Sequence, residues 1–227
     1  MRTKPEPDHA QQQRGQTAAQ PIHQAQMTLV IFGAGGHGRV VADAALCAAY
    51  WQVVATDRNP ALCQGQLLPG VSLVAIQEAQ PQSNAVHVAI GDNAARERES
   101  RSLGCQRLVT VQHPAASVAS VSQIAPGCFI AAQAVVAPGA CLDIGVIVNH
   151  AAVVDHDCAV GAFSHIAPAA VLGGGVHLGQ RVLVGAGAVV QPGLRITDDT
   201  VIGSGAVVCS HIDAAGTYIG IPARRVS

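Results

Sequence analysis

A six-residue period of apolar residues runs from Val118 to Val208 and constrains the fold more than any other feature. Every sixth residue of this stretch is Ile, Leu or Val. These register residues are Val118, Ile124, Ile130, Val136, Leu142, Val148, Val154, Val160, Ile166, Leu172, Leu178, Val184, Val190, Ile196, Ile202 and Val208. The residue two places earlier is mostly small, as at Ser122, Cys128, Ala134, Ala140, Ala152, Cys158, Ser164, Ala170, Ala188 and Ala206. A strict repeat of this kind takes precedence over local secondary-structure propensity.

The repeat predicts a β-solenoid. Side chains alternate along a strand, so the register residue and the small residue before it point into the same interior, the small one near a corner. Glycines directly follow several register residues, where the chain begins each corner: Gly161, Gly173, Gly179, Gly185 and Gly203. This is the hexapeptide repeat of the left-handed parallel β-helix, in which three hexapeptides make one triangular coil. We therefore predict an all-β prism of a little over five coils within residues 113–227.

The stretch before the repeat, residues 27–112, has an α/β pattern. It opens with "LVIFGAGGHGRVVADAAL", an apolar strand followed by Gly33, Gly35 and Gly38 in Gly-x-Gly-x-x-Gly spacing and then a helix. We predict strands at 29–32, 52–55, 71–74, 86–90 and 107–111, and helices at 38–49 and 93–103. This length holds one of the two mononucleotide-binding halves of a dinucleotide fold. The prediction is a small half-Rossmann βαβ domain.

The glycine loop indicates a phosphate or nucleotide site. Glycines let the backbone approach a phosphate, and the N-terminus of the following helix favours negative charge. His37 sits at this turn and could donate to a diphosphate. Asp57 ends the next predicted strand, where the ribose-binding acid of an NAD site would lie. An NAD-linked oxidoreductase is therefore an alternative, weakened by the missing second half and the lack of a separate substrate domain.

Composition narrows the function classes. The net charge is −1 and 12% of residues are charged, so no basic surface predicts binding to nucleic acid or to a membrane. No apolar run approaches the ~18 residues that span a bilayer. Seven cysteines without a CxxC motif predict reduced thiols in the cytoplasm. Residues 1–26 are polar and Gln-rich, so we expect a disordered, dispensable tail, with Met27 a candidate start.

Four segments together resemble the NeuD/PglD-like family of bacterial sugar acyltransferases: "VIFGAGGHGRVVADA", "AIGDNAARER", "VNHAAVVDHDCAVGAFSHIAPAAVLGGGVHLG" and "YIGIPARRV". The family includes sialic-acid O-acetyltransferases and UDP-amino-sugar N-acetyltransferases. The resemblance implies that the N-terminal domain holds the nucleotide of a nucleotide-linked sugar. The substrate-binding residues would be Gly35, Gly36, His37, Asp57 and Asn93. It further implies acetyl-CoA as co-substrate, no metal, and a homotrimer that binds CoA between adjacent prisms.

Histidines cluster in "NHAAVVDHDCAVGAFSHIAP", at His150, His156 and His165. Acyl transfer from a thioester needs a base of near-neutral pKa, which histidine provides. His156 lies between Asp155 and Asp157. The resemblance implies that His156 is the general base, with Asp157 the preferred orienting carboxylate and Asp155 the alternative. His150 is the next candidate base.

The resemblance also assigns residues to acetyl-CoA. They are His165, Gly174 in "LGGG" and Ser204 in the turn after Ile202. A backbone N–H at Gly174 could stabilise the oxyanion of the tetrahedral intermediate.

The resemblance favours acetyl-CoA-dependent acetylation of the amino group of a UDP-amino-sugar. The alternative within the same fold is O-acetylation of a sialic-acid-type sugar. A zinc carbonic anhydrase built on a β-helix, with a three-histidine site, is a remote alternative. It leaves the N-terminal α/β domain unexplained.

Overall fold

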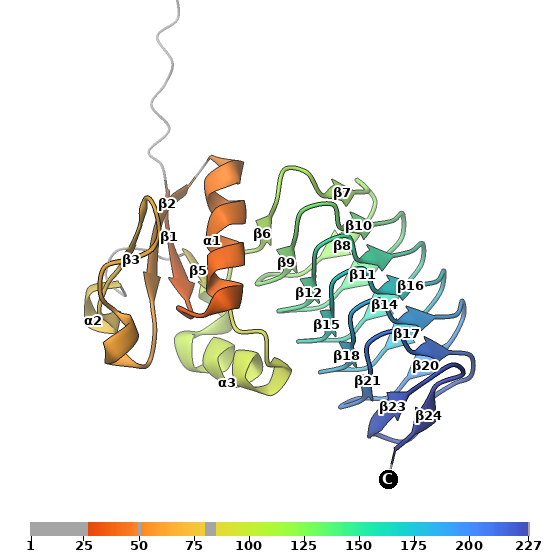
Figure 1. Ribbon diagram of the computed structural model, residues 1–227. Helices are drawn as coiled ribbons and strands as arrows, with labels where there is room; N and C mark the ends of the chain where they lie inside the picture. Colours follow the sequence, from red (N-terminus) through yellow and green to blue (C-terminus); the bar gives the residue numbers. More distant parts are fainter. Residues whose placement is uncertain (1–26, 50, 80–84, 227) are drawn as a thin grey trace, which may run out of the picture.

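The computed structural model describes residues 27–49, 51–79 and 85–226, and the expected tail at residues 1–26 lies outside them. Figure 1 shows two parts side by side, an N-terminal α/β domain and a C-terminal stack of short strands. Helix α1 lies between the N-terminal sheet and the first strands of the stack (Figure 1). The described residues therefore form one α/β layer docked on one face of a β-helix.

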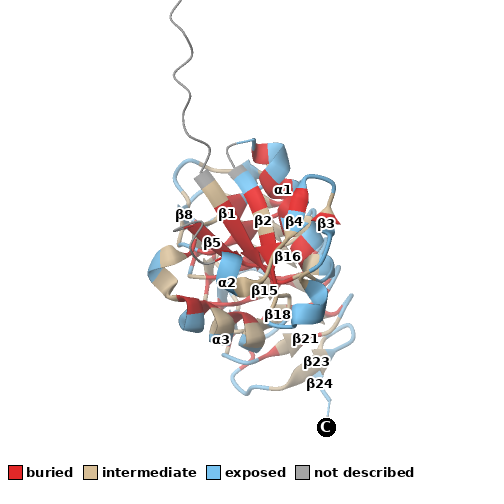
Figure 2. Cartoon of the chain, turned by 90° about the vertical axis from the view of Figure 1, so that its left-hand side faces the viewer, coloured by how far each residue is buried: buried red, intermediate tan, exposed pale blue. Residues whose placement is uncertain are grey.

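The N-terminal domain contains one five-stranded sheet in the order β3-β4-β2-β1-β5. Its elements are β1 Met27–Phe32, α1 Gly36–Ala48, β2 Trp51–Thr56, η1 Pro60–Leu62, β3 Gln66–Leu68, β4 Val71–Leu73, α2 Ile76–Ala79, β5 Ala85–Val88, α3 Asn93–Leu103 and η3 Cys105–Arg107. All neighbours are parallel except β3 and β4, which form an antiparallel pair. Figure 2 shows β1 and β2 buried at the centre. The half-Rossmann prediction is thus confirmed.

The C-terminal part is a triangular β-helix. Its strands are β6 Val111–Gln112, β7 Ser117–Val118, β8 Gln123–Ile124, β9 Phe129–Ile130, β10 Val135–Val136, β11 Cys141–Leu142, β12 Ile147–Val148, β13 Val153–Val154, β14 Ala159–Val160, β15 His165–Ile166, β16 Val171–Leu172, β17 His177–Leu178, β18 Leu183–Val184, β19 Val189–Val190, β20 Arg195–Ile196, β21 Val201–Ile202, β22 Val207–Val208, β23 Thr217–Ile219 and β24 Arg224–Arg225. The predicted register residues occupy the second position of the strands from β7 to β22 and form the prism core.

The strands form three faces, which we number in chain order. The first face holds β6, β9, β12, β15, β18, β21, β23 and β24, the second face runs from β7 to β22, and the third face runs from β8 to β20. Up to β23, each strand pairs in parallel with its neighbour one coil away on the same face, as Val136 does with Val154, and β24 pairs antiparallel with β23. Three hexapeptides therefore make one coil, as the repeat predicts.

Every corner from position 127 to position 205 contains a left-handed residue three places after a register residue. Some are glycines, such as Gly139 and Gly175, but others carry side chains, including Asp157 with φ 58°. The glycines that directly follow register residues have a different cause. A Cβ on Gly161 would lie 2.5 Å from the carbonyl of Gly179 in the next coil. Close stacking of coils, rather than left-handed backbone, explains glycine there.

The first face of the prism packs against the N-terminal domain. Leu29, Ile31 and Ala45 from the domain share one core with Phe129 and Ile147, the outward residues of β9 and β12. Helices α2 and α3 cover the opposite side of the sheet. Helix α1 is therefore buried between a sheet and a prism, which explains its short aliphatic side chains.

Two sequence predictions need correction. The strand predicted at 107–111 is absent: η3 covers Cys105–Arg107, Leu108 makes an isolated bridge to Val86, and Val111 already belongs to β6. The chain leaves the sheet here to enter the prism, so its apolar residues serve two cores. The prediction also missed β3, although the Pro69-Gly70 turn before β4 was a hairpin signal. Strand β6 precedes the expected domain boundary at residue 113.

Helices long and apolar enough to cross a bilayer do not occur among residues 27–49, 51–79 and 85–226.

Candidate active site

His156 and Asp157 meet at the corner between the second and third faces, where the chain passes from β13 to β14. Nδ1 of His156 lies 2.9 Å from Oδ2 of Asp157. The backbone N–H of His156 donates to Oδ1 of Asp155 at 2.7 Å. The hydrogen bond that the ring donates to Asp157, followed by the charge of Asp155, raises the pKa of His156 above its usual value. Asp157 is thus the carboxylate that hydrogen-bonds the imidazole ring, whereas Asp155 hydrogen-bonds the backbone N–H of His156.

Gly174 lies against the same imidazole from the next coil. A Cβ at this position would collide with Nε2 of His156, so only glycine leaves the ring in place. On other coils the N–H of the equivalent residue donates to the preceding side chain: Ile144 to Asp143, His150 to Asn149 and His156 to Asp155. Gly173 has no side chain, and the Gly174 N–H finds no acceptor in the described part of the chain. A free amide donor therefore adjoins Nε2.

The glycine loop after β1 lies at the carboxyl ends of β1 and β5, a region that we call the crevice. Helices leave these two strands toward opposite sides of the sheet, which is where open α/β sheets bind ligands. Gly33 has φ 124° and Gly38 packs against its carbonyl, so both are required by the fold. Gly35 and Gly36 have no atom within 4 Å of a notional Cβ. The fold does not require glycine there, and the space is open to a ligand.

Two predicted substrate residues have structural partners. The carboxylate of Asp57 accepts hydrogen bonds from the N–H groups of Ala34 and Asn59, both at 2.9 Å. It therefore holds the glycine loop, and its role toward a substrate stays a prediction. Asn93 donates to the carbonyl of Arg181 at 3.0 Å and accepts from Arg96 at 2.9 Å. Asn93 thus joins the domain to the prism.

His37 points from the start of α1 into the domain junction. Its ring packs edge-on against Phe129, with 5.4 Å between centroids, and its Nε2 is buried without a partner among the described residues. Burial, with His87, His165, Arg96 and His150 nearby, lowers its pKa to about 3. The ring is neutral at physiological pH, so a hydrogen bond, and not charge, is what His37 could offer a diphosphate, and that role stays a prediction.

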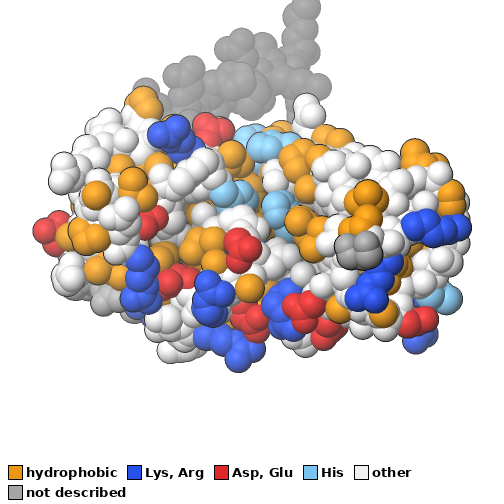
Figure 3. Space-filling model, turned by 60° about the horizontal axis from the view of Figure 1, so that its bottom comes forward, with side chains coloured by type: hydrophobic (Ala, Val, Ile, Leu, Met, Phe, Trp, Pro, Cys, Tyr) orange, Lys and Arg blue, Asp and Glu red, His pale blue; other side chains and the backbone are white. Residues whose placement is uncertain are grey.

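His165 stands on the first face, opposite His37, with 6.3 Å between ring centroids. Asn149 Nδ2 lies 3.1 Å from its Nε2, and the ring also hydrogen-bonds the carbonyl of Gly91. Burial and the charge of Arg96 lower the pKa of His165 to about 4. Both ring nitrogens are therefore engaged at the junction. Figure 3 shows histidines gathered in the hollow between the two domains.

The predicted residues thus fall into two groups. His156, Asp157 and Gly174 share the corner between the second and third faces. The glycine loop, Asn93 and His165 surround the junction on the first face. Ser204 is exposed at the corner between the first and second faces, away from both His156 and His165 in one chain.

Comparison with solved structures connects this geometry to known proteins. The acetyltransferase domain of PglB from Neisseria gonorrhoeae FA1090, in complex with acetyl coenzyme A, is 33% identical with a TM-score of 0.83. The similarity covers 88% of this chain and 100% of that chain. The chain belongs to the NeuD/PglD-like family of sugar acyltransferases. Its prism is the left-handed β-helix expected from the repeat.

Further comparisons agree with this membership. The model of the PglD N-terminal domain matches residues 28–103, and that of the bacterial transferase hexapeptide (six repeats) matches residues 175–210. PerB from Caulobacter crescentus, in complex with CoA and GDP-perosamine, is 34% identical, with a TM-score of 0.81 over 88% of this chain and 97% of that chain. UDP-3-O-acylglucosamine N-acyltransferase of Bordetella pertussis is 32% identical over 77 residues. That match spans 34% of this chain and about a fifth (21%) of the relative.

Sequence analysis missed two buried polar residues of this NeuD/PglD-like protein. Arg96 is 1% exposed and bonds carbonyl groups of both domains. His87 is also buried, with Nδ1 3.0 Å from the Val109 carbonyl, and burial lowers its pKa to about 4. The sequence contained a signal for the burial of Arg96. Arg96, Ser100 and Leu103 have the i, i+4, i+7 spacing of one helix face, and they are the buried residues of α3.

The third face carries a shallow hollow of about 550 Å³. Small outward residues create it, including Cys141, Ala159 and Gly161 on adjacent coils. Strand β14, which directly follows the His156 corner, contributes to its lining. The prism of this protein therefore offers a groove beside the candidate base.

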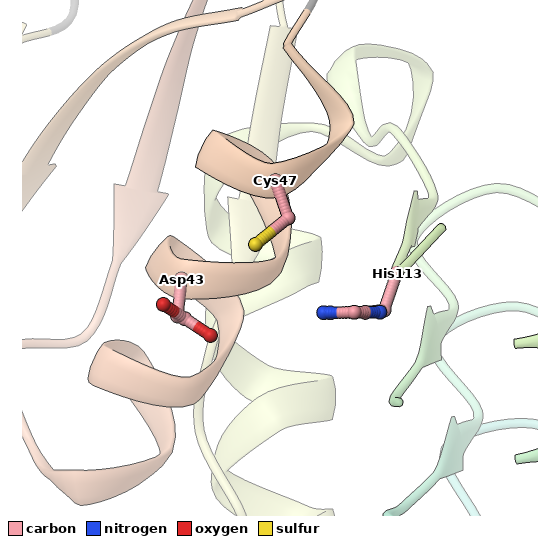
Figure 4. Close-up of side chains that lie close together, drawn as sticks. All are labelled: Asp43, Cys47 and His113. Carbon is pink, nitrogen blue, oxygen red and sulfur yellow. The ribbon is translucent and has the colours of Figure 1, made fainter. Parts of the chain in front are cut away.

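A cluster of Asp43, Cys47 and His113 joins α1 to the first coil, with ligand-type atoms within 4.8 Å of one another (Figure 4). The N–H of Ala115 donates to Nδ1 of His113 at 2.9 Å, so the ring hydrogen lies on Nε2. A cation bound at either ring nitrogen would have to displace that arrangement. The cluster as built therefore suits hydrogen bonding rather than coordination.

Proposed function

We propose that this protein transfers the acetyl group of acetyl-CoA to the amino group of a nucleotide-linked sugar, with His156 as general base. The observation that carries the proposal is the His156–Asp157 pair beside the free N–H of Gly174. The glycine crevice of the N-terminal domain supports a nucleotide-linked acceptor. The acetyltransferase activity named for PglB, and the CoA and GDP-perosamine bound to PerB, support the reaction class.

The chemistry follows from these atoms. Asp157 holds the Nδ1 hydrogen of His156, which leaves the Nε2 lone pair to take a proton. The amine nitrogen of the sugar attacks the thioester carbonyl while Nε2 accepts the amine proton. The Gly174 N–H donates to the oxyanion. The intermediate then collapses, the C–S bond breaks, and the departing CoA sulfur takes the proton back from His156.

We expect a UDP-amino-sugar as the acceptor. Direct measurement of CoA release with UDP-linked and GDP-linked amino-sugars tests this expectation, with a sialic acid as the hydroxyl acceptor. CoA release only with the hydroxyl acceptor would show that the protein is an O-acetyltransferase and not an N-acetyltransferase. Tight NADH binding would overturn it, although the engaged Asp57 carboxylate and the single mononucleotide half argue against a dinucleotide. Zinc-dependent activity would favour the carbonic anhydrase alternative.

We further propose that the working enzyme is a homotrimer whose active site is shared between chains. The side chains of His156 and Asp157 are 60% and 73% exposed in one chain, too open to exclude water from a thioester. The crevice lies on the first face, whereas His156 lies at the corner between the second and third faces. A neighbouring chain could bring its crevice to His156, with CoA in the third-face hollow between them.

Hybrid assemblies test the shared site. Chains carrying His156→Ala and chains carrying Gly35→Val are each expected to have strongly reduced activity, the first through kcat and the second through weaker nucleotide-sugar binding. Co-expression should restore activity, because some sites then combine an intact base with an intact crevice. Light scattering should report about three times 23.1 kDa. A fully active monomer, or hybrids no better than their parents, would contradict the shared site. We also expect a cytoplasmic enzyme, which its seven free cysteines support.

A further inference from the structure

Arg96 is a buried cation that holds both domains at once. Its Nε donates to the Gly145 carbonyl at 2.8 Å and its Nη2 to the Phe163 carbonyl at 2.6 Å, both on prism corners. Its Nη1 donates to the carbonyls of Ile90 and Gly91 at 2.9 and 3.1 Å, after β5. The guanidinium therefore spans from the carboxyl end of the N-terminal sheet to two coils of the prism.

The bonds of Arg96 end on carbonyl and amide oxygens, without a carboxylate among them. Asn93 supplies the one side-chain acceptor, at 2.9 Å. Burial lowers the pKa of Arg96 to about 10, so the group remains charged at neutral pH. A buried charge is costly unless all its donors are satisfied, and an apolar side chain could pack two domains together at lower cost. What Arg96 contributes in return is the fixed geometry of the N–H donors of its guanidinium group.

A chain of hydrogen bonds continues from Arg96 toward the crevice. The Gly91 carbonyl accepts from both Arg96 and the ring of His165. Nε2 of His165 accepts from Asn149 Nδ2 at 3.1 Å, and Asn149 Oδ1 accepts the N–H of His150 at 2.9 Å. One guanidinium thus orients a backbone turn, a ring and a prism corner in succession.

This chain lies beside the crevice that would hold the nucleotide sugar. The turn at Gly91 directly follows β5, whose carboxyl end forms the crevice together with that of β1. His37, from the glycine loop, faces His165 across the junction. Any loosening at Arg96 therefore moves groups on two sides of the crevice.

We propose that Arg96 is a positioning residue for the nucleotide-sugar site, fixing the Gly91 turn and the His165 ring against the prism. The inference rests on the proposed function, because it assigns the sugar substrate to this crevice. Arg96 acts through Gly91, His165 and Asn149, since all five of its N–H groups are already used within the protein.

Two variants separate the effect of the Arg96 charge from the effect of the geometry of its guanidinium donors. Arg96→Lys keeps the charge but cannot reach both domains, and Arg96→Gln removes the charge while keeping a donor. Both should raise the KM for the nucleotide sugar by about 10- to 100-fold, because small misplacements in a binding site cost that much. The KM for acetyl-CoA should change less than twofold. Arg98→Lys, an exposed position on the same helix, is the matched control and should leave both constants unchanged.

Asn149→Ala provides a second test that leaves Arg96 intact. It removes the donor to His165 at the far end of the hydrogen-bond chain, so the same selective rise in KM is expected, but smaller. This variant keeps the proposal testable if an Arg96 variant does not fold. Equal losses for both substrates, or no change in the sugar KM of a folded variant, would overturn the positioning role.

A spectroscopic measurement separates this inference from the proposed function. In ¹⁵N-histidine NMR of the full chain, His165 should lose its fixed tautomer in Arg96→Lys. In Arg96→Gln its pKa should also rise, because Arg96 is the charged group that lowers it. The same spectra follow His37, which is faced by His87, His165, Arg96 and His150.

Failure of wild-type protein to bind UDP or GDP in calorimetry would defeat the nucleotide-sugar assignment, and the positioning role with it. An unchanged His165 signal in both Arg96 variants would defeat the positioning role alone.

Discussion

Nδ1 of His156 lies 2.9 Å from Oδ2 of Asp157, although the two residues are consecutive in the chain. Neighbouring side chains on a strand point in opposite directions. They meet here because Asp157 occupies the left-handed corner position, with φ 58°. Aspartate tolerates this conformation better than most residues with a side chain. The same corner geometry that bends the coil therefore builds the acid–base pair.

Replacing the base should affect chemistry more than binding. We expect His156→Ala to reduce kcat by about 10²- to 10⁴-fold, the usual contribution of a general base. Asp157→Asn should cost less, since Asp157 only orients and polarises the ring. Acetyl-CoA affinity should persist in both. The control is His211→Ala, an exposed histidine at the end of the prism, which should keep wild-type kcat. More than about a tenth of wild-type kcat in His156→Ala would instead favour His150 as the base.

The pH–rate profile should carry the signature of the pair. The base acts when neutral, so kcat/KM should rise with pH through an apparent pKa above 6.5, because Asp157 and Asp155 raise the pKa of His156. In Asp157→Asn this limb should move to lower pH. The substrate amine titrates as well, so a hydroxyl acceptor without that titration serves as the comparison. A limb that does not move in Asp157→Asn would exclude the pair as its origin.

Gly174 should tolerate no side chain. Gly174→Ala places a methyl group on Nε2 of His156, so we expect a loss of kcat comparable to that of His156→Ala in a folded protein. Gly187→Asn is the control, because Gly187 has open space around it and a left-handed φ that asparagine accepts. Circular dichroism verifies the fold, and retained turnover in Gly174→Ala would contradict this placement of the ring.

The glycines of the opening loop should separate into two kinds. Gly35→Val should weaken nucleotide-sugar binding without lowering Tm, since open space surrounds Gly35. Gly33→Val should lower Tm by several degrees or prevent folding. Its φ is 124°, and its Cβ would lie 2.7 Å from the Ala89 carbonyl. Calorimetric titration with UDP and thermal melts measure both. Equal effects on Tm would show that Gly35 also serves the fold.

Stability should fall in mild acid. Burial holds the pKa values of His37, His87 and His165 at about 3, 4 and 4, whereas unfolded histidine titrates near 6.5. Below pH 6.5 these three histidines bind protons in the unfolded chain but stay neutral in the folded chain. The free energy of unfolding should therefore decrease by about 1.4 kcal/mol per pH unit for each ring until roughly pH 4. Urea unfolding between pH 7 and pH 4 measures this slope.

A variant isolates the contribution of one ring. His37→Phe removes one titrating group and should flatten the slope by about a third, whereas the exposed His211→Gln should leave it unchanged. The same slope in His37→Phe would mean that His37 does not remain neutral in the folded protein.

The sequence allowed the prism to be predicted almost completely, because its repeat is local and covers every coil. The register residues, the small residues and the helix at 93–103 all match the structure. The pairing of His156 with Asp157 followed from adjacent positions and the family resemblance. Patterns of this kind depend on residues a few places apart, which is the range over which periodicity carries information.

The domain junction could not be predicted in the same way. Arg96 bonds Gly145 and Phe163, which are 49 and 67 residues away, and the repeat gives no sign of that contact. The assignment of His165 to acetyl-CoA stays a prediction, and the bonds of its ring to Asn149 and Gly91 were not foreseen from the sequence. Side chains that join two domains depend on how the domains dock, and single-sequence patterns do not contain that information.

The uniform coil has a genetic consequence. Each strand pairs with the strand one coil later, so a duplication of one coil's codons would extend the protein without disturbing any ladder. A duplication of six or twelve residues would keep the register residues inward but move the later strands to another face, and a length that is not a multiple of six would turn them outward. Added beyond β20, such a coil would leave His156 and the α1 junction in place. Added between β9 and β12, such a coil would move His165 about 4.8 Å, the spacing of one coil, farther from His37. Length variation in descendants of this gene should therefore come in whole coils and concentrate at the far end of the prism.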